Sequence, residues 1–360
     1  MKDLFLKLVK IPSPSGHEQV VAKFLVNYLD KLGWKAQKDK WGNVVATLTA
    51  PGKRVLLASH MDTVQKPGQL IKPMFRAGKF TSDGTTILGA DNKAGIIVLL
   101  EVARELINNP IGVEVVLVFT IREEAGEMGS SLLDLADINP DYIVNVDGGK
   151  TPGTIDVRAL GQTVFEIKVL GKAAHAAINP EKGIHAIKVA SEIVTHLEMG
   201  KTSQGEVVNI GQVSGGIQTN VIPDEVMLKG EVRAFDQAKI NLLFTKVKNM
   251  AKAIALKYGA QTHIQMISKI GVPVWEEKDG QELVEFAKAA AKKLGLKFIK
   301  SEMWGSSDAN YLSQHGVPTI SVNRGGKNPH SASESISLRE MVETKSFLSA
   351  ILSEIANNGK

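Results

Sequence analysis

Residues 55–62 of the chain, Val-Leu-Leu-Ala-Ser-His-Met-Asp, indicate the fold more clearly than any other stretch. A short apolar run of strand length is followed at once by polar residues, one of them a histidine. Similar apolar runs recur at 44–48, 113–121, 142–146 and 319–322. Helical patterns of apolar residues lie between them, notably at 93–107 and 281–294. Nearly continuous apolar strands that alternate with helices predict an α/β fold with a mixed, mainly parallel sheet flanked by helices.

The middle of the chain has a different pattern. Strand-like segments are separated by two long helical segments, in the order typical of a small α+β sandwich with a mostly antiparallel sheet. The strand-like segments are 164–169, 207–213 and 226–232, and the helical ones are 184–197 and 237–258. Glycines at 161 and 271 bracket this region. We therefore expect an inserted α+β domain at 160–272 and a catalytic domain made of 1–159 and 273–360.

Composition excludes several classes of function. The 360 residues include no cysteine, so disulfides, thiolate nucleophiles and cysteine-ligated metals are excluded, and any metal must be held by His, Asp or Glu. The net charge of +5 comes mostly from scattered lysines without interleaved aromatic residues, which does not favour nucleic-acid binding. No apolar run has the length of a membrane span, and residues 1–16 lack the pattern of an export signal. We expect a cytoplasmic protein that binds neither nucleic acid nor membrane.

Polar residues follow four of the predicted strands at the point where each strand ends. In an open α/β sheet this edge is where ligands bind. Asp91 lies just before a predicted helix, where an N-cap alone would explain it, and each of the other residues alone has an equally ordinary explanation. As a set, two histidines and several carboxylates suit zinc, cobalt or manganese. The residues at the strand ends are His60, Asp62, Glu123, Glu124, Asp147 and His330.

These motifs resemble the co-catalytic zinc exopeptidases, the family that includes peptidase T, aminoacylase and the bacterial glutamate carboxypeptidase. The resemblance runs along essentially the whole chain, in order, and the segment at 85–95 is closest to the peptidase T branch. Its motifs are Ser-His-Met-Asp-Thr-Val (59–64), Thr-Thr-Ile-Leu-Gly-Ala-Asp-Asn-Lys-Ala-Gly (85–95), Glu-Glu-Ala-Gly (123–126), Asp-Gly (147–148), Gly-Lys-Ala-Ala-His-Ala (171–176), Gln-Thr-Asn-Val-Ile-Pro (218–223), Gly-Ser-Ser-Asp-Ala-Asn (305–310) and Asn-Pro-His-Ser (328–331).

The resemblance implies a site for two divalent metal ions, most simply zinc. Asp91 would bridge them, and the remaining ligands would be His60 and Asp147 for one ion and Glu124 and His330 for the other. Asp62 would orient the imidazole of His60. Glu123 would be the general base that takes a proton from a metal-bridging water and passes it to the leaving amine.

The resemblance also implies roles for the inserted domain. His175 would donate a hydrogen bond to the developing oxyanion, and Asn220 and Arg233 would hold the polar ends of the substrate. Inserted domains of this kind pair across a two-fold axis in the family, which implies a homodimer. Whether His175 then acts in its own chain or in the partner's site is open.

The implied activity is hydrolysis of an amide bond in a short peptide. An aspartate at position 147 matches the peptidase T and dipeptidase branches, where the carboxypeptidases and acylases usually have glutamate. This favours an aminopeptidase that acts on di- or tripeptides. The alternatives are an N-acyl-amino-acid deacylase or a carboxypeptidase with the same two-metal mechanism. A third alternative is a catalytically silent metal- or peptide-binding protein on the same scaffold.

Overall fold

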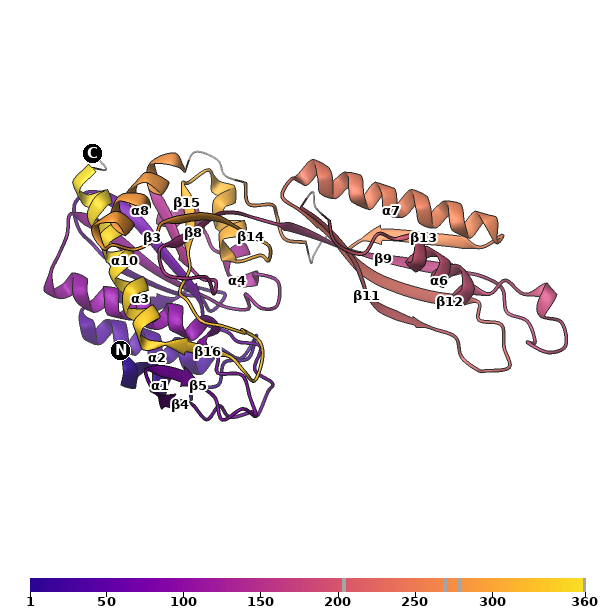
Figure 1. The fold of residues 1–360 in the computed structure, drawn as a ribbon, viewed down its shortest axis with the longest axis horizontal. Coiled ribbons are helices and arrows are strands. Elements are labelled where there is room, and N and C mark those ends of the chain that lie inside the picture. The colour runs from indigo at the N-terminus through magenta and orange to yellow at the C-terminus, as the bar shows by residue number, and fades with distance from the viewer. Residues whose placement is uncertain (203–204, 268–270, 277–279, 359–360) are drawn as a thin grey trace. The chain divides into compact units, whose positions relative to one another are not determined.

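The computed structural model describes residues 1–202, 205–267, 271–276 and 280–358 (Figure 1). The chain divides into two compact units, and the larger is discontinuous in sequence. It comprises Met1–Ala159 and Trp275–Lys360, and the smaller comprises Leu160–Val274.

The larger unit is built on an eight-stranded sheet in the order β1-β2-β6-β3-β7-β15-β8-β14. The four central strands, β6, β3, β7 and β15, run parallel to one another, while β1 and β2 pair antiparallel at one edge. This confirms the predicted mixed, mainly parallel sheet. The strands are β1 (Lys35–Lys38), β2 (Val44–Leu48), β3 (Lys53–His60), β6 (Val113–Thr120), β7 (Tyr142–Val146), β8 (Thr154–Ala159), β14 (Ile299–Met303) and β15 (Thr319–Val322).

Helices cover both faces of this sheet, which explains why its central strands are apolar at nearly every position. In β3, Val55 and Leu57 point into the larger core, and Leu56 and Ala58 point into a smaller core on the other face. The larger core is covered by α1 (Lys2–Leu8), α2 (Gln19–Leu32), α3 (Ala90–Asn108), α8 (Gln281–Lys293) and α10 (Leu338–Asn358). The smaller core is covered by short segments that include α5 (Leu135–Ile138) and α9 (Asp308–Leu312). Another short helix, α4 (Met128–Ser131), contacts α9.

A small sheet of three strands completes this unit. Two of its strands precede α3 in the sequence, and the third directly precedes α10. Its order is β16-β5-β4, with β4 at Met74–Arg76, β5 at Lys79–Thr81 and β16 at Ser335–Ser337. The pairing of β16 with β5 joins a segment near the C-terminus to one near residue 80.

The smaller unit has an antiparallel sheet in the order β10-β11-β12-β9-β13, and two helices pack on one of its faces (Figure 1). Burial along β12 alternates, as expected when one face of a strand is covered and the other is exposed. The strands are β9 (Gly161–Leu170), β10 (Gly200–Lys201), β11 (Glu206–Gly215), β12 (Glu225–Ala234) and β13 (Gln261–Met266). The helices are α6 (Ala186–His196) and α7 (Gln237–Lys257), and a short 3-10 turn spans Pro180–Lys182.

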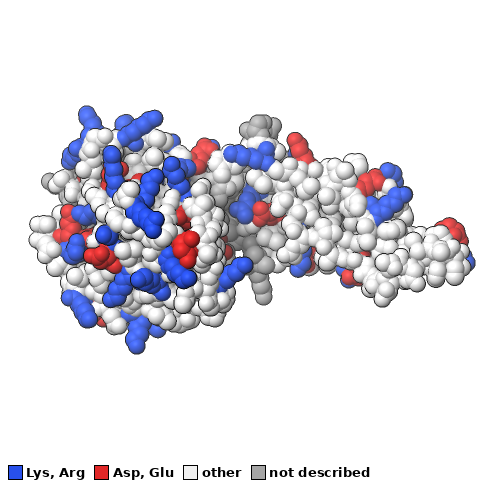
Figure 2. Space-filling model, turned by 60° about the horizontal axis from the view of Figure 1, so that its bottom comes forward, with Lys and Arg blue, Asp and Glu red and all other residues white. Residues whose placement is uncertain are grey.

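The surface carries charges of both signs. On the face of the molecule seen in Figure 2, Lys and Arg side chains are spread among Asp and Glu side chains. Within the described residues, none of the helices is long and apolar enough to cross a membrane.

Candidate active site

The predicted metal ligands gather at the carboxyl ends of four neighbouring parallel strands. His60 is the last residue of β3, and Asp147 directly follows β7. Glu123 and Glu124 come just after β6, and the loop after β15 carries His330. Because β6, β3, β7 and β15 are adjacent and parallel, their carboxyl ends meet at one edge of the sheet.

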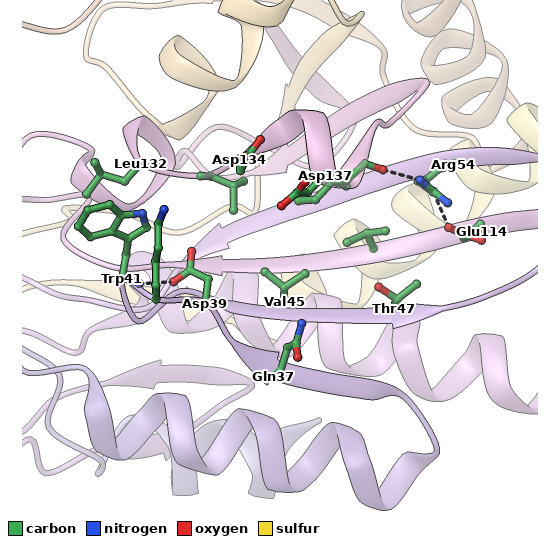
Figure 3. A pocket seen from close by; sticks show the side chains of 14 residues that line it. Gln37, Asp39, Trp41, Val45, Thr47, Arg54, Glu114, Leu132, Asp134 and Asp137 are labelled. Carbon is green, nitrogen blue, oxygen red and sulfur yellow. Dashed lines mark hydrogen bonds and ion pairs between the residues drawn. The ribbon is translucent and has the colours of Figure 1, made fainter.

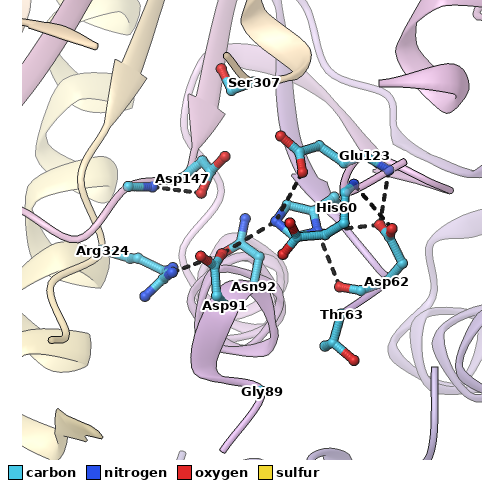
Figure 4. Close-up of polar contacts among 12 residues, drawn as sticks. His60, Asp62, Thr63, Gly89, Asp91, Asn92, Glu123, Asp147, Ser307 and Arg324 are labelled. Atoms are coloured by element: carbon cyan, nitrogen blue, oxygen red, sulfur yellow. Dashed lines mark hydrogen bonds and ion pairs between the residues drawn. The ribbon is translucent and has the colours of Figure 1, made fainter. Parts of the chain in front are cut away.

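Asp91 completes the cluster from the first turn of α3, beside His60 (Figure 4) and within reach of His330. Its Oδ1 atom is 3.3 Å from His60 Nε2, and its Oδ2 atom is 3.5 Å from His330 Nε2. His330 Nε2 is also 2.9 Å from Oε1 of Glu124. One carboxylate therefore presents a different oxygen to each imidazole.

Three groups of side chains bring one ligand atom each to within 4.8 Å of one another. Two of these groups are the triads expected from the sequence, each of which contains Asp91. The third contains Glu123, so its carboxylate faces the same space as the ligands. The groups are His60, Asp91 and Asp147; Asp91, Glu124 and His330; and His60, Glu123 and Glu124.

Several buried carboxyl groups lie close together at this edge of the sheet. Burial, together with the neighbouring charge of Asp91, raises the pKa of Asp147 to about 6. Burial also raises the pKa of Glu123 well above its usual range, and the charge of Asp147 adds to this. Bound cations would stabilise the ionised forms of these clustered carboxylates.

The histidines respond to the same charges. Burial disfavours the charged form of His60, but Glu123 and the other carboxylates around it raise its pKa well above the usual value. Hydrogen bonds to Asp91 and Glu124 raise the pKa of His330 to about 10. In the chain alone, protons on these imidazoles therefore balance part of the carboxylate charge.

The residues present fit two divalent cations. Oxygen and nitrogen donors from carboxylates and imidazoles suit zinc, cobalt or manganese. The tautomer of His60 is also appropriate, because Nδ1 lies 3.1 Å from the backbone carbonyl of Asp62, which can only accept. Nδ1 must carry the proton in that contact, which leaves Nε2 as the ligand atom of a neutral imidazole.

Asp62 does more than the sequence indicated. Its side chain is fully buried, and Oδ1 lies 3.3 Å from Nδ1 of His60. The same carboxylate also accepts hydrogen bonds from the backbone N–H groups of Glu123 (3.0 Å) and Glu124 (3.1 Å). Asp62 therefore fixes the turn that carries both glutamates.

Two further residues of the site were not singled out from the sequence. Arg324, in the loop after β15, is buried, and its guanidinium lies 2.8 Å from Oδ1 of Asp91. Glu334, four residues after His330, is also buried. Both are charged residues close in sequence to the predicted ligand His330, and this was the signal that could have identified them. The sequence does not reveal that they are buried.

The remaining predicted residues lie in the smaller unit. His175 is exposed in the loop after β9, and its Nδ1 accepts hydrogen bonds from the backbone N–H groups of Ala177 and Ile178. Its Nε2 therefore carries a proton and can donate a hydrogen bond. Asn220 is exposed, and its backbone carbonyl accepts a hydrogen bond from the backbone N–H of Ala176, the residue after His175. Arg233, on β12, is paired with Glu231.

Two cavities of similar size lie in the larger unit. A cavity of about 410 Å³ is lined by the metal-ligand cluster together with Lys150, Met303 and Trp304. Another, of about 440 Å³, lies over β1, β2 and β6 beside Trp41 (Figure 3). There Arg54 is already paired with Glu114 and the carbonyl of Ile138. The first cavity is the candidate active site because only it combines volume with convergent ligand atoms.

Comparisons with known proteins show the family of the chain. Residues 56–354 match the model of peptidase family M20/M25/M40. The uncharacterized protein YqjE of Bacillus subtilis is 34% identical over 98% of this chain and 97% of its own length. The crystal structure of the aminopeptidase PepT from Bacillus cereus has a TM-score of 0.90 and 32% identity, covering 99% of this chain and 98% of that one. That of a tripeptidase from Staphylococcus aureus has a TM-score of 0.93 and 28% identity, with the same coverage.

Proposed function

The chain belongs to peptidase family M20/M25/M40, in its peptidase T branch, and on that premise we propose that it is an aminopeptidase that releases the N-terminal residue of di- and tripeptides. Membership makes it a metal-dependent peptidase. The choice of substrate is supported by the similarity to the aminopeptidase PepT and to a tripeptidase. The observation that carries the two-metal mechanism is the position of Asp91, with one carboxylate oxygen toward His60 and the other toward His330. A bridging ligand between two cations needs this arrangement.

The metal-binding residues fall into two sets that share Asp91. His60 and Asp147 would hold one ion, and Glu124 and His330 the other. Two divalent ions, most simply zinc, would polarise the scissile carbonyl and lower the pKa of the attacking water when bound.

Glu123 is the residue we assign as general base. Its carboxylate faces the same space as the ligands, and its backbone is held by Asp62. It is nearly buried, and burial favours its protonated form, so it can accept a proton from water and then release it to the leaving amine. Glu124 beside it serves as a ligand.

Residues of the smaller unit would act on the substrate. The Nε2–H of His175 would donate to the oxyanion, which its tautomer allows. Asn220 and Arg233 would hold polar ends of the peptide, and Arg233 would have to exchange its contact with Glu231 for a substrate carboxylate. We further propose a homodimer through this unit, in the cytoplasm.

The second candidate function is an N-acyl-amino-acid deacylase or carboxypeptidase with the same metal site. The test is a substrate panel in which protein loaded with zinc, cobalt or manganese is given Leu-Gly-Ala, Leu-Ala and N-acetyl-alanine. Release of leucine and Gly-Ala from the tripeptide, without hydrolysis of the acetylated substrate, supports the aminopeptidase, whereas release of alanine and Leu-Gly would indicate a carboxypeptidase. Faster hydrolysis of the acetylated substrate would replace it with the deacylase. Inactivity of fully loaded protein toward every substrate would favour a binding protein.

A further inference from the structure

The segment between α1 and α2 reaches the predicted catalytic centre. We call residues 13–18, Ser-Pro-Ser-Gly-His-Glu, the strap. The hydroxyl of Ser15 donates a hydrogen bond of 2.6 Å to Oδ2 of Asp62. That same oxygen accepts from the backbone N–H of Glu124, while Oδ1 accepts from that of Glu123. Ser15 therefore contacts the carboxylate that holds both glutamates.

The strap makes a second contact with the same turn. Glu18 is buried, and its Oε1 atom accepts from the backbone N–H groups of Gly16 (2.7 Å) and Arg122 (3.1 Å). The three consecutive N–H groups at 122–124 thus donate to two buried carboxylates, one from the strap and one that the strap contacts. Arg122 has a φ of 51°, a conformation that residues other than glycine keep only when their surroundings hold them in it.

The strap itself is fixed at its beginning. The backbone N–H of Thr63 donates to the carbonyl of Ser13 at 2.9 Å, next to a parallel bridge between Pro14 and Thr63. Just before the strap, the carbonyl of Ile11 accepts a hydrogen bond of 2.6 Å from the buried ammonium of Lys93. Ser15 is therefore presented to Asp62 by backbone that is anchored to the strands and helix of the site.

We propose that Ser15 and Glu18 are positioning residues for the general base, so that the strap belongs to the catalytic apparatus. Their contacts hold the turn at 122–124 in the one conformation that aims the side chain of Glu123 at the substrate. A small displacement of a catalytic group lowers the rate of the chemical step more than it weakens substrate binding. The inference rests on the proposed role of Glu123.

Four variants of the full chain test this inference. Ser15→Ala removes the hydroxyl, and Ser15→Thr keeps one. Ser349→Ala is the matched control, because its hydroxyl makes a similar bond of 2.5 Å to the carboxylate of Glu105, between α10 and α3 and outside the site. Glu123→Gln reports on the base itself. For each variant kcat and KM are measured with a tripeptide, together with metal content and thermal unfolding.

We expect Ser15→Ala to lower kcat about tenfold, as loss of one hydrogen bond to a charged group would, and to change KM less than about twofold. Metal content should stay at that of the unaltered chain. Ser15→Thr should restore most of kcat, and Ser349→Ala should leave kcat unchanged even if both alanine variants unfold at a lower temperature.

Two results overturn the positioning role: full kcat in Ser15→Ala, or a loss that threonine does not restore while the protein stays folded. These results are distinct from failure of the proposed mechanism. Undiminished activity of Glu123→Gln rejects the base on which the inference rests. Inactive Glu123→Gln together with fully active Ser15→Ala rejects the strap alone.

Discussion

The carboxylate of Glu334 accepts a hydrogen bond of 2.8 Å from the backbone N–H of Asp91. Its other oxygen accepts from the N–H groups of Leu88 and Gly89, each at 2.8 Å. One buried side chain therefore holds the loop that carries the proposed bridging aspartate. Because Glu334 lies four residues after His330, these contacts link the loops of two proposed ligands that are far apart in the sequence.

Replacing this carboxylate should weaken metal binding. Glu334→Gln retains only one acceptor oxygen for three N–H donors, so the loop before α3 loses part of its support. We expect metal affinity to fall about 10- to 100-fold, the usual range for losing a group that orients a ligand. Titration with a competing fluorescent chelator measures it. Glu343→Gln on α10, whose carboxylate pairs with Arg339 away from the site, is the control, and equal affinity of both variants would contradict the prediction.

Glu123→Gln should separate catalysis from metal binding. The amide cannot accept a proton from water, so kcat should fall at least ~100-fold, the low end for losing a general base. Metal content, measured by plasma emission spectrometry, should remain that of the unaltered chain. A variant that instead loses metal would show that Glu123 is a ligand and that the assignment of the two neighbouring glutamates must be reversed.

Removal of a ligand should lower metal content and activity together. We expect this for His60→Ala, Asp91→Ala and His330→Ala, and Asp91→Ala should have the largest effect because both sets of ligands include it. Chelator should abolish peptide hydrolysis, and added zinc, cobalt or manganese should restore it. Full activity after verified removal of metal would refute the mechanism.

Metal binding should weaken as pH falls. His330, whose pKa is raised to about 10, is protonated in the metal-free chain at pH 7, so a metal ion must displace that proton. Below about pH 6, Asp147 is protonated as well and competes in the same direction. Isothermal titration in two buffers of different ionisation enthalpy counts the protons released. Proton release of zero at pH 7 would contradict this account.

Mixing two inactive variants tests the proposed homodimer. If His175 completes the partner's site, a mixed dimer of His175→Ala and Glu123→Gln contains one site with both residues intact. Equal mixing gives about half mixed dimers, so about a quarter of the original activity should return. Size-exclusion chromatography with light scattering must confirm the dimer. Mixed dimers without activity would show that His175 does not act across the interface.

The central strands could be predicted from the sequence because burial on both faces makes them apolar throughout. The predicted ranges 44–48, 142–146 and 319–322 coincide with β2, β7 and β15. Strand β1 was missed because most of its residues are exposed and none of its side chains is fully buried. Short edge and outlying strands such as β4 and β14 are stabilised by their pairing partners, and a sequence pattern does not contain that information.

Most ligand candidates could be named because they follow a recognisable strand closely or begin a helix, and His330 because it lies in the loop that follows a recognisable strand. What holds them in place could not be named in the same way. Arg324, Glu334 and Ser15 make their contacts with residues that are distant along the chain, and nothing in their own sequence neighbourhood indicates burial. Glu123 and Glu124 were given separate roles, but the sequence does not show that Asp62 and Glu18 fix the turn that carries them.

The position of β15 has a consequence for synthesis of the protein. This strand lies between β7 and β8 in the sheet, and β8 pairs with β15 and β14. Both partners of β8 are encoded after the inserted unit. While the ribosome makes residues 160–274, β7 and β8 lack these partners and have open edges, which are templates for aggregation. We therefore expect a nascent chain that ends between residues 160 and 322 to bind chaperones until β15 has emerged from the ribosome.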